Sequence, residues 1–145
     1  MWLLCAVIYG LNTMEPLDVR DFILSLPNVE EVEPFGEDEA VVYKVGGKWF
    51  AVYIYSRPDI FAVKCHPDRA ILLRDEFSAI TPAWHFNKRH WNDLMVDFLP
   101  SDIVRREICH SYLTVIRRNI SPKALREEYL AAALAAGIED AELPE

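Results

Sequence analysis

Residues 40–55 have the sequence A-V-V-Y-K-V-G-G-K-W-F-A-V-Y-I-Y, in which two runs of β-branched and aromatic residues flank Gly46 and Gly47. A two-residue hairpin turn needs positive φ values, which glycine adopts without a steric penalty. The stretch therefore predicts an antiparallel β-hairpin, and it is the clearest local structure in the chain.

A two-residue turn also sets the register of this hairpin. The register pairs Val45 with Lys48, Tyr43 with Phe50 and Val41 with Val52. Because side chains alternate along a strand, these residues are expected to share the face that packs on the core. The opposite face is expected to carry Val42, Lys44, Trp49, Ala51 and Tyr53.

Helices and further strands are expected on both sides of the hairpin. Proline near the first turn and apolar stripes predict helices at 16–26, 67–77, 101–118 and 122–136, the first with Leu17 on its apolar stripe. A short edge strand from Val29 and a strand at 60–65 complete the pattern. In the longest helix the buried stripe is predicted to be Val104, Ile108, Tyr112, Val115 and Ile116, with Arg106, His110 and Arg117 on the far side.

Length and charge limit the class of protein. The 145 residues suit one domain, and the net charge of −8 is distributed unevenly along the chain. Residues 1–40 carry −8, residues 41–126 carry +6, and residues 127–145 carry −6. Only the middle segment therefore favours a polyanionic partner. Three scattered cysteines form no disulfide framework, which favours the reducing cytoplasm.

The two ends differ in composition from the rest. Residues 1–13 are apolar, but they are too few to span a bilayer as a helix and lack the basic start of a signal peptide. We interpret them as an extension from an upstream start, with Met14 as the true first residue, and expect no membrane role. Residues 14–136 are the predicted domain, and the acidic residues 137–145 are predicted to be a disordered tail.

No motif in the sequence predicts catalysis or a metal. His85 and His90 are five residues apart, which matches neither a helical pair nor a zinc-finger pair. No nucleophile elbow, Walker loop or dinucleotide fingerprint is present in the sequence. We therefore expect a protein that is not an enzyme and that needs no cofactor and no metal.

Residues 84–91, W-H-F-N-K-R-H-W, combine rings with cations. Bases stack on aromatic side chains, and lysine and arginine neutralise phosphates, so the segment suits nucleic acid. A structural role is an alternative, because buried indoles need hydrogen-bond partners and asparagine or histidine can secure the start of a strand. From these residues alone, the structural role is favoured.

Several short segments together resemble the MmcQ/YjbR family of small bacterial proteins. They are S-L-P-N-V-E-E (25–31), P-F-G (34–36), K-V-G-G-K-W-F-A (44–51), V-K-C-H-P (63–67), T-P-A-W-H-F-N-K-R-H-W-N (81–92) and H-S-Y (110–112). The resemblance implies an α+β fold of the CyaY-like type, a single compact domain with an antiparallel sheet flanked by helices. It also implies DNA binding in a double-wing mode, in which β-hairpins contact the duplex.

The leading hypothesis is therefore weak, shape-led and salt-sensitive binding of double-stranded DNA without catalysis. Phosphate contacts are expected from Lys44 and Lys48 of the hairpin and from the adjacent cations Lys88 and Arg89. Asn87 and His90 are expected to donate hydrogen bonds, and the Trp91 ring is expected to stack or wedge. The hypothesis requires that these residues share one outward surface.

The alternative is a module that binds a small ligand or a protein in an aromatic cleft. Its expected lining is Trp49, Tyr53, Trp84, Phe86 and Trp91. A third interpretation is that the motifs serve folding alone. The sequence does not determine the oligomeric state.

Overall fold

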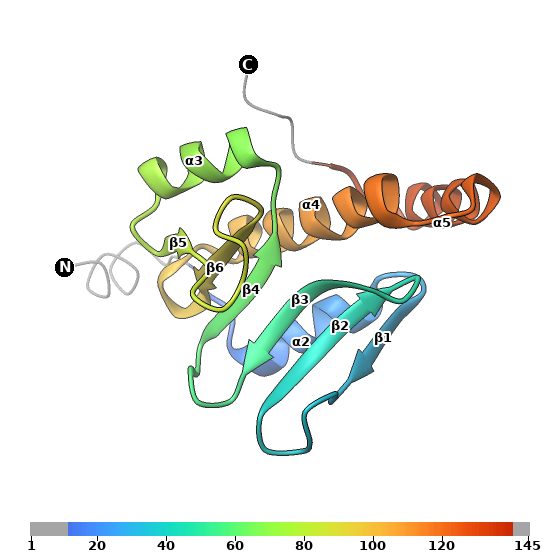
Figure 1. The fold of residues 1–145 in the computed structure, drawn as a ribbon. Coiled ribbons are helices and arrows are strands. Elements are labelled where there is room, and N and C mark those ends of the chain that lie inside the picture. Colours follow the sequence, from blue (N-terminus) through green and yellow to red (C-terminus); the bar gives the residue numbers. More distant parts are fainter. Residues whose placement is uncertain (1–11, 141–145) are drawn as a thin grey trace.

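A six-stranded antiparallel sheet with strand order β1-β2-β3-β4-β6-β5 forms the centre of the structure (Figure 1). The computed structural model describes residues 12–140. The strands are β1 (Val29–Val32), β2 (Ala40–Val45), β3 (Lys48–Ile54), β4 (Ile60–Lys64), β5 (Ile80–Pro82) and β6 (Trp91–Met95). The helices are α2 (Pro16–Ser25), α3 (Pro67–Glu76), the 3-10 turn η1 (Val96–Phe98), α4 (Ser101–Asn119) and α5 (Lys123–Ala135). The predicted α+β class, with one antiparallel sheet and flanking helices, is confirmed.

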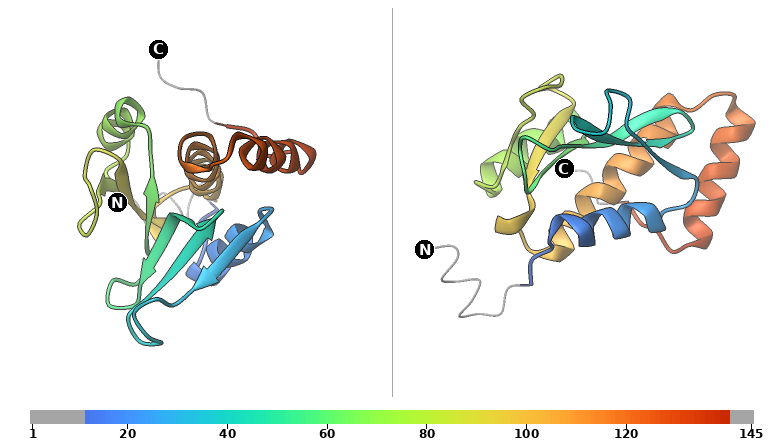
Figure 2. Two further views of the ribbon diagram at one scale, coloured as in Figure 1. Left: turned by 45° about the vertical axis from the view of Figure 1, so that its right-hand side comes forward. Right: turned by 90° about the horizontal axis from the view of Figure 1, so that it is seen from below.

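Helices lie against one face of this sheet, as the two further views in Figure 2 show. The main core lies between that face and α2, α3 and α4. All five residues of the predicted stripe on α4 are fully buried there, which confirms the helical periodicity. The opposite face carries a smaller apolar cluster, in which Val42, Val52 and Ala62 pack with Trp49, Phe86 and Trp91.

The hairpin has the predicted turn but not the predicted register along its whole length. Val45 pairs with Lys48 and Lys44 with Trp49, as a two-residue turn requires, but Tyr43 pairs with Ala51. The extra residue is Phe50, a β-bulge. Beyond the bulge the faces of β3 are exchanged: Ala51 and Tyr53 join the main core, and Val52 lies on the other face. Our assignment of these three residues was wrong because a bulge shifts the alternation by one.

Two further predictions about helix faces were wrong. Leu17 is 70% exposed, and the buried residues of α2 are Val19 and Ile23, followed by buried Leu26 just after its end. His110, expected on the far side of α4, is buried. It is buried because the chain that follows α5 returns across α4, where Ile138 packs against the main core and Asp140 hydrogen-bonds the His110 ring.

The chain ends differ in part from the expected boundaries. Residues 137–140, expected to begin a disordered tail, hold defined contacts with α4. The predictions for residues 1–11 and 141–145 lie outside the described residues. Next to the first of these segments, the carbonyl of Asn12 accepts the Ser101 N–H and Met14 is buried.

The two glycines of the hairpin turn provide a stability test. Both have positive φ, so alanine at either costs about 1 kcal/mol of backbone strain. A Cβ at Gly47 would meet open space, whereas one at Gly46 would overlap the Cδ1 of buried Ile120 and stand 3.3 Å from Tyr129. We therefore expect Gly46→Ala to lower the free energy of unfolding by about 1–3 kcal/mol more than Gly47→Ala. Urea denaturation of both variants measures the difference, and equal losses would contradict this packing of the turn.

Candidate functional site

A groove of about 390 Å³ opens where the end of β4, the start of α3, the end of the β5–β6 loop and the last turn of α4 meet. Its lining includes two cations, two imidazoles, two amides and one indole. The lining residues are Lys64, Cys65, His66, Pro67, Asn87, His90, Trp91, Thr114, Arg118 and Asn119. None of these ten residues is acidic, in a protein whose net charge is −8.

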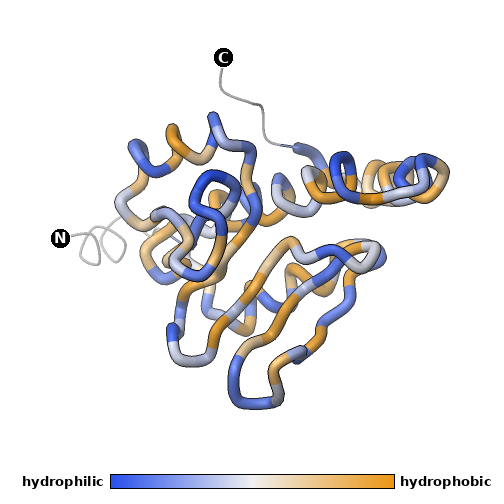
Figure 3. Tube along the Cα trace, viewed as in Figure 1, coloured by the Kyte–Doolittle hydropathy of each residue, from blue (hydrophilic) through white to orange (hydrophobic). Residues whose placement is uncertain are grey.

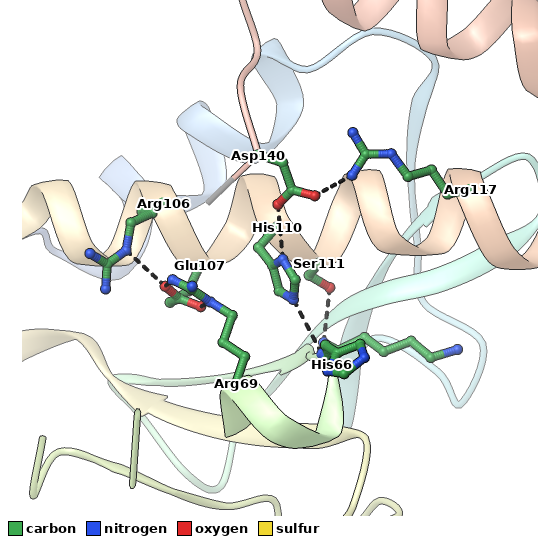
Figure 4. Close-up of polar contacts among 9 residues, drawn as sticks. His66, Arg69, Arg106, Glu107, His110, Ser111, Arg117 and Asp140 are labelled. Carbon is green, nitrogen blue, oxygen red and sulfur yellow. Dashed lines mark hydrogen bonds and ion pairs between the residues drawn. The ribbon is translucent and has the colours of Figure 1, made fainter. Parts of the chain in front are cut away.

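Buried polar residues of α4 hold the backbone on one side of this groove (Figure 4). The Ser111 hydroxyl accepts the Lys64 N–H at 2.9 Å and donates to the Phe50 carbonyl at 2.6 Å. The His110 Nε2 accepts the His66 N–H at 3.2 Å. Because Nε2 accepts, a neutral His110 carries its proton on Nδ1, which donates to Asp140 at 2.9 Å. Helix α4 thus fixes where β4 ends and α3 begins.

Asp140 completes this arrangement from the segment after α5. Its carboxylate accepts hydrogen bonds from His110 and from Arg117. Burial acts to raise the pKa of Asp140, but the hydrogen bonds and charges of His110 and Arg117 together hold it below its ordinary value. Asp140 therefore remains ionised at neutral pH and keeps the His110 ring in place.

The charges around the groove repel one another. Burial lowers the pKa of Lys64, and the nearby cations Arg118 and Lys48 lower it further. Burial also lowers the pKa of His90, as do Arg89, Lys64, Arg118 and His66. The Lys64 ammonium donates to the Asn119 side-chain carbonyl at 2.9 Å, which leaves it able to donate to a ligand. Groups of one sign held together in this way favour an anion.

The structure brings only part of the predicted site residues to this groove. Asn87, His90 and Trp91 line it. Lys48 and Arg89 are exposed and close enough to influence its charged groups. Figure 3 shows the β5–β6 loop that carries most of these residues as a hydrophilic segment.

Lys88 and Lys44 have other positions. The Lys88 ammonium donates hydrogen bonds to the carbonyls of Ala83 and Trp84, at 2.9 and 3.3 Å, and thereby stabilises the β5–β6 loop. Lys44 is partly buried, pairs with Trp49 across the hairpin, and is not among the lining residues. Of the predicted residues, Asn87, His90 and Trp91 therefore line one groove, and these two lysines do not.

Two other side chains that were predicted to contact DNA, those of Asn87 and Trp91, make contacts within the protein. The Asn87 side-chain carbonyl accepts the Arg89 N–H at 2.9 Å, which forms a turn. The Trp91 ring is partly buried and stacks on Phe86 with centroids 4.8 Å apart. A ring held in this way can cover a ligand at the groove but is poorly placed to wedge between base pairs.

Sequence reasoning missed Lys64, His66, Arg118 and Asn119 as site residues. Lys64 and His66 stand in the motif V-K-C-H-P, which was noted only for its resemblance. Arg118 and Asn119 come from the end of α4, a segment 52 positions or more along the chain from His66. No local pattern predicts which helix end reaches a given strand end.

The predicted aromatic cleft is divided in the structure. Trp49, Phe86 and Trp91 pack together on the face of the sheet away from the helices. Tyr53 lies on the other face, against Phe61, because of the bulge. Trp84 is 68% exposed and stacks on His85.

Neither a metal site nor a membrane-spanning helix is found in the described part of the chain. Among residues 12–140, no group of three or more His, Cys, Asp or Glu side chains could hold a metal ion. Within the same range, none of the helices is both long and apolar enough to cross a membrane.

Comparisons with known proteins found a matching family, a similar curated protein and a similar solved structure. A model of the YjbR family matches residues 24–114, more than half of the chain. The uncharacterized protein YbdF of Escherichia coli O157:H7 is 39% identical over 69 residues, which span 47% of this chain and 56% of that protein. The crystal structure of Deinococcus radiodurans protein DR2400, a DUF419 domain, matches with a TM-score of 0.73 and 28% identity, covering 90% of this chain and 93% of that chain.

Proposed function

The chain belongs to the YjbR family, and from that premise we propose that it binds double-stranded DNA by taking a backbone phosphate into the basic groove. The observation that carries the proposal is the gathering of Lys64, His66, His90 and Arg118 from separate elements around one cavity without an acidic residue in its lining. We further propose that the protein acts in the cytoplasm and binds without catalysing a reaction.

The size of the groove supports phosphate contact and not base recognition. A volume of about 390 Å³ accommodates a phosphate with part of its sugar but not a base pair within a duplex. Exposed Lys48 and Arg89 at the margins are available to neighbouring phosphates. Contacts to phosphate position a protein on the duplex but carry no direct sequence information. The proposal is therefore shape-led, weak binding.

In this proposal the hairpin does not act as a wing that contacts the duplex, which is the role that the resemblance implies. Its turn packs on Ile120 and Tyr129, so Gly46 does not project freely from the molecule. Strand β1 also covers one edge of β2. The hairpin contributes Lys48 to a surface that is formed mainly by β4, the β5–β6 loop and α4.

Fluorescence anisotropy of a labelled duplex of about 20 base pairs tests the proposal at low salt. We expect saturable binding with similar dissociation constants for unrelated sequences, which weaken to the range of ordinary nonspecific binding, about 1–100 µM, at physiological salt. An unlabelled duplex should compete, whereas glutamate should not. Failure to reach saturation at low salt would overturn the proposal.

The His90 imidazole makes this binding depend on pH. In the free protein the pKa of His90 is lowered by burial and by Arg89, Lys64, Arg118 and His66. A bound phosphate offsets these cations and raises the pKa of His90, so binding takes up a proton. Binding should therefore strengthen as the pH falls from about 8 to about 5.5, where phosphodiesters remain ionised.

His90→Gln should retain binding at the higher pH and lose much of this pH dependence. Anisotropy titrations at a series of pH values measure both proteins. An identical pH dependence in the variant would exclude His90 as the group that takes up the proton.

A further inference from the structure

A second cavity, of about 430 Å³, lies on the face of the sheet that the helices leave uncovered. Its volume is in the range of small-molecule sites. Its lining consists of the aromatic rings of Phe35, Trp49 and Phe86, the smaller side chains of Ala40, Val52, Ile54 and Ser56, the His85 imidazole and the Glu39 carboxylate.

The rings of this cavity stand nearly at right angles. Trp49 meets Phe35 at 79° with centroids 6.2 Å apart, and meets Phe86 at 73° with centroids 6.5 Å apart. Two parallel rings suit a flat guest that stacks between them. Rings that are perpendicular to a central indole instead suit a rounded group, which touches several rings at once.

The charge near these rings favours a cation. The Glu39 carboxylate lines the cavity and makes no hydrogen bond or ion pair with another residue in the range 12–140. Glu39 ends the segment 33–39, which carries four acids and no base. Neither lysine nor arginine is among the lining residues. The faces of aromatic rings attract cations, most strongly where water is displaced.

We propose that this cavity binds a small molecule with a quaternary ammonium group, held by the rings of Phe35, Trp49 and Phe86 and by the Glu39 carboxylate. The rounded, weakly hydrated head of such a group matches the perpendicular rings, and its charge matches the carboxylate. This site is separate from the basic groove and has the opposite charge. The proposal therefore does not depend on DNA binding.

Isothermal titration calorimetry with choline tests the proposal, at low ionic strength and about pH 8, where histidine is ordinarily neutral. The control ligand is the neutral isostere of choline, in which carbon replaces the ammonium nitrogen. Choline should bind about 5- to 30-fold more tightly than the isostere, because only the cation gains from the rings and the carboxylate. Equal affinities, or no binding of choline, would overturn the proposal.

Variants locate the site and control for folding. Phe35 is 61% exposed, so Phe35→Ala should fold normally and weaken choline binding at least about fivefold. Glu39→Gln should weaken it about 2- to 5-fold, whereas Glu37→Gln, from the same acidic segment but outside the lining, should not. If Glu39→Gln and Glu37→Gln had the same effect, or Phe35→Ala had none, the cavity would not be the binding site.

Discussion

Replacing both Lys64 and Arg118 by glutamate should weaken duplex binding at least about tenfold, because two phosphate contacts are lost and two repulsive charges are introduced. Both residues line the groove, and each lowers the pKa of His90, so their charges act at the same place. Arg118 is exposed and Lys64 partly exposed, so the reversal should leave the core intact. Anisotropy at low salt measures the loss.

A matched control separates the groove from the total charge. Lys123→Glu with Arg105→Glu changes the net charge by the same amount, and both residues are exposed and lie outside the groove lining. This variant should lose affinity only slightly. Equal losses in the two double variants would mean that the duplex responds to overall charge, and the groove would have no special role.

Glu107→Ala should have the largest effect on stability, about 3–5 kcal/mol, because it removes the carboxylate from a buried ion pair. The Arg69 guanidinium meets Glu107 through two hydrogen bonds, of 2.5 and 3.0 Å, and Arg106 adds a third at 3.0 Å (Figure 4). The Arg69 and Glu107 side chains are only 8% and 2% exposed. These contacts join α3 to α4 beside the groove.

Two further variants test the reason for this loss. Arg106 is 40% exposed, so Arg106→Ala should cost only about 0–1 kcal/mol. Arg69→Met combined with Glu107→Leu removes both charges together, and it should be more stable than Glu107→Ala, since no charge is buried without its partner. Urea denaturation compares the three. A loss below about 1 kcal/mol for Glu107→Ala would show that the pair contributes little.

Local patterns in the sequence predicted the elements well. The glycine pair predicted the hairpin, and the stripe from Val104 to Ile116 predicted the buried face of α4. Both follow from a few neighbouring residues, because turn geometry and helical periodicity are local. The bulge at Phe50 does not follow from the pattern, because A-V-V-Y-K-V and K-W-F-A-V-Y-I alternate equally well without it.

The sequence singled out only those groove residues that are neighbours in the chain. Asn87, His90 and Trp91 were found because they stand in one conspicuous segment. The role of Lys88 was missed, since a lysine that binds the carbonyls of its own loop has the same sequence signal as one that binds phosphate. Lys64 and Arg118 meet through the packing of α4 on β4, which depends on the whole fold. His110 was predicted to lie on the far side of α4 from helical periodicity alone, which does not show that the segment after α5 returns across it.

The salt dependence of duplex binding tests the central claim most directly. If the groove holds phosphate, the logarithm of the binding constant should fall linearly with the logarithm of salt concentration, with a slope of about −2 to −4. Arg118→Gln should make that slope shallower by about 1, because one phosphate contact is lost. A slope near zero for the wild-type protein, or the same slope for both proteins, would contradict phosphate binding at this groove.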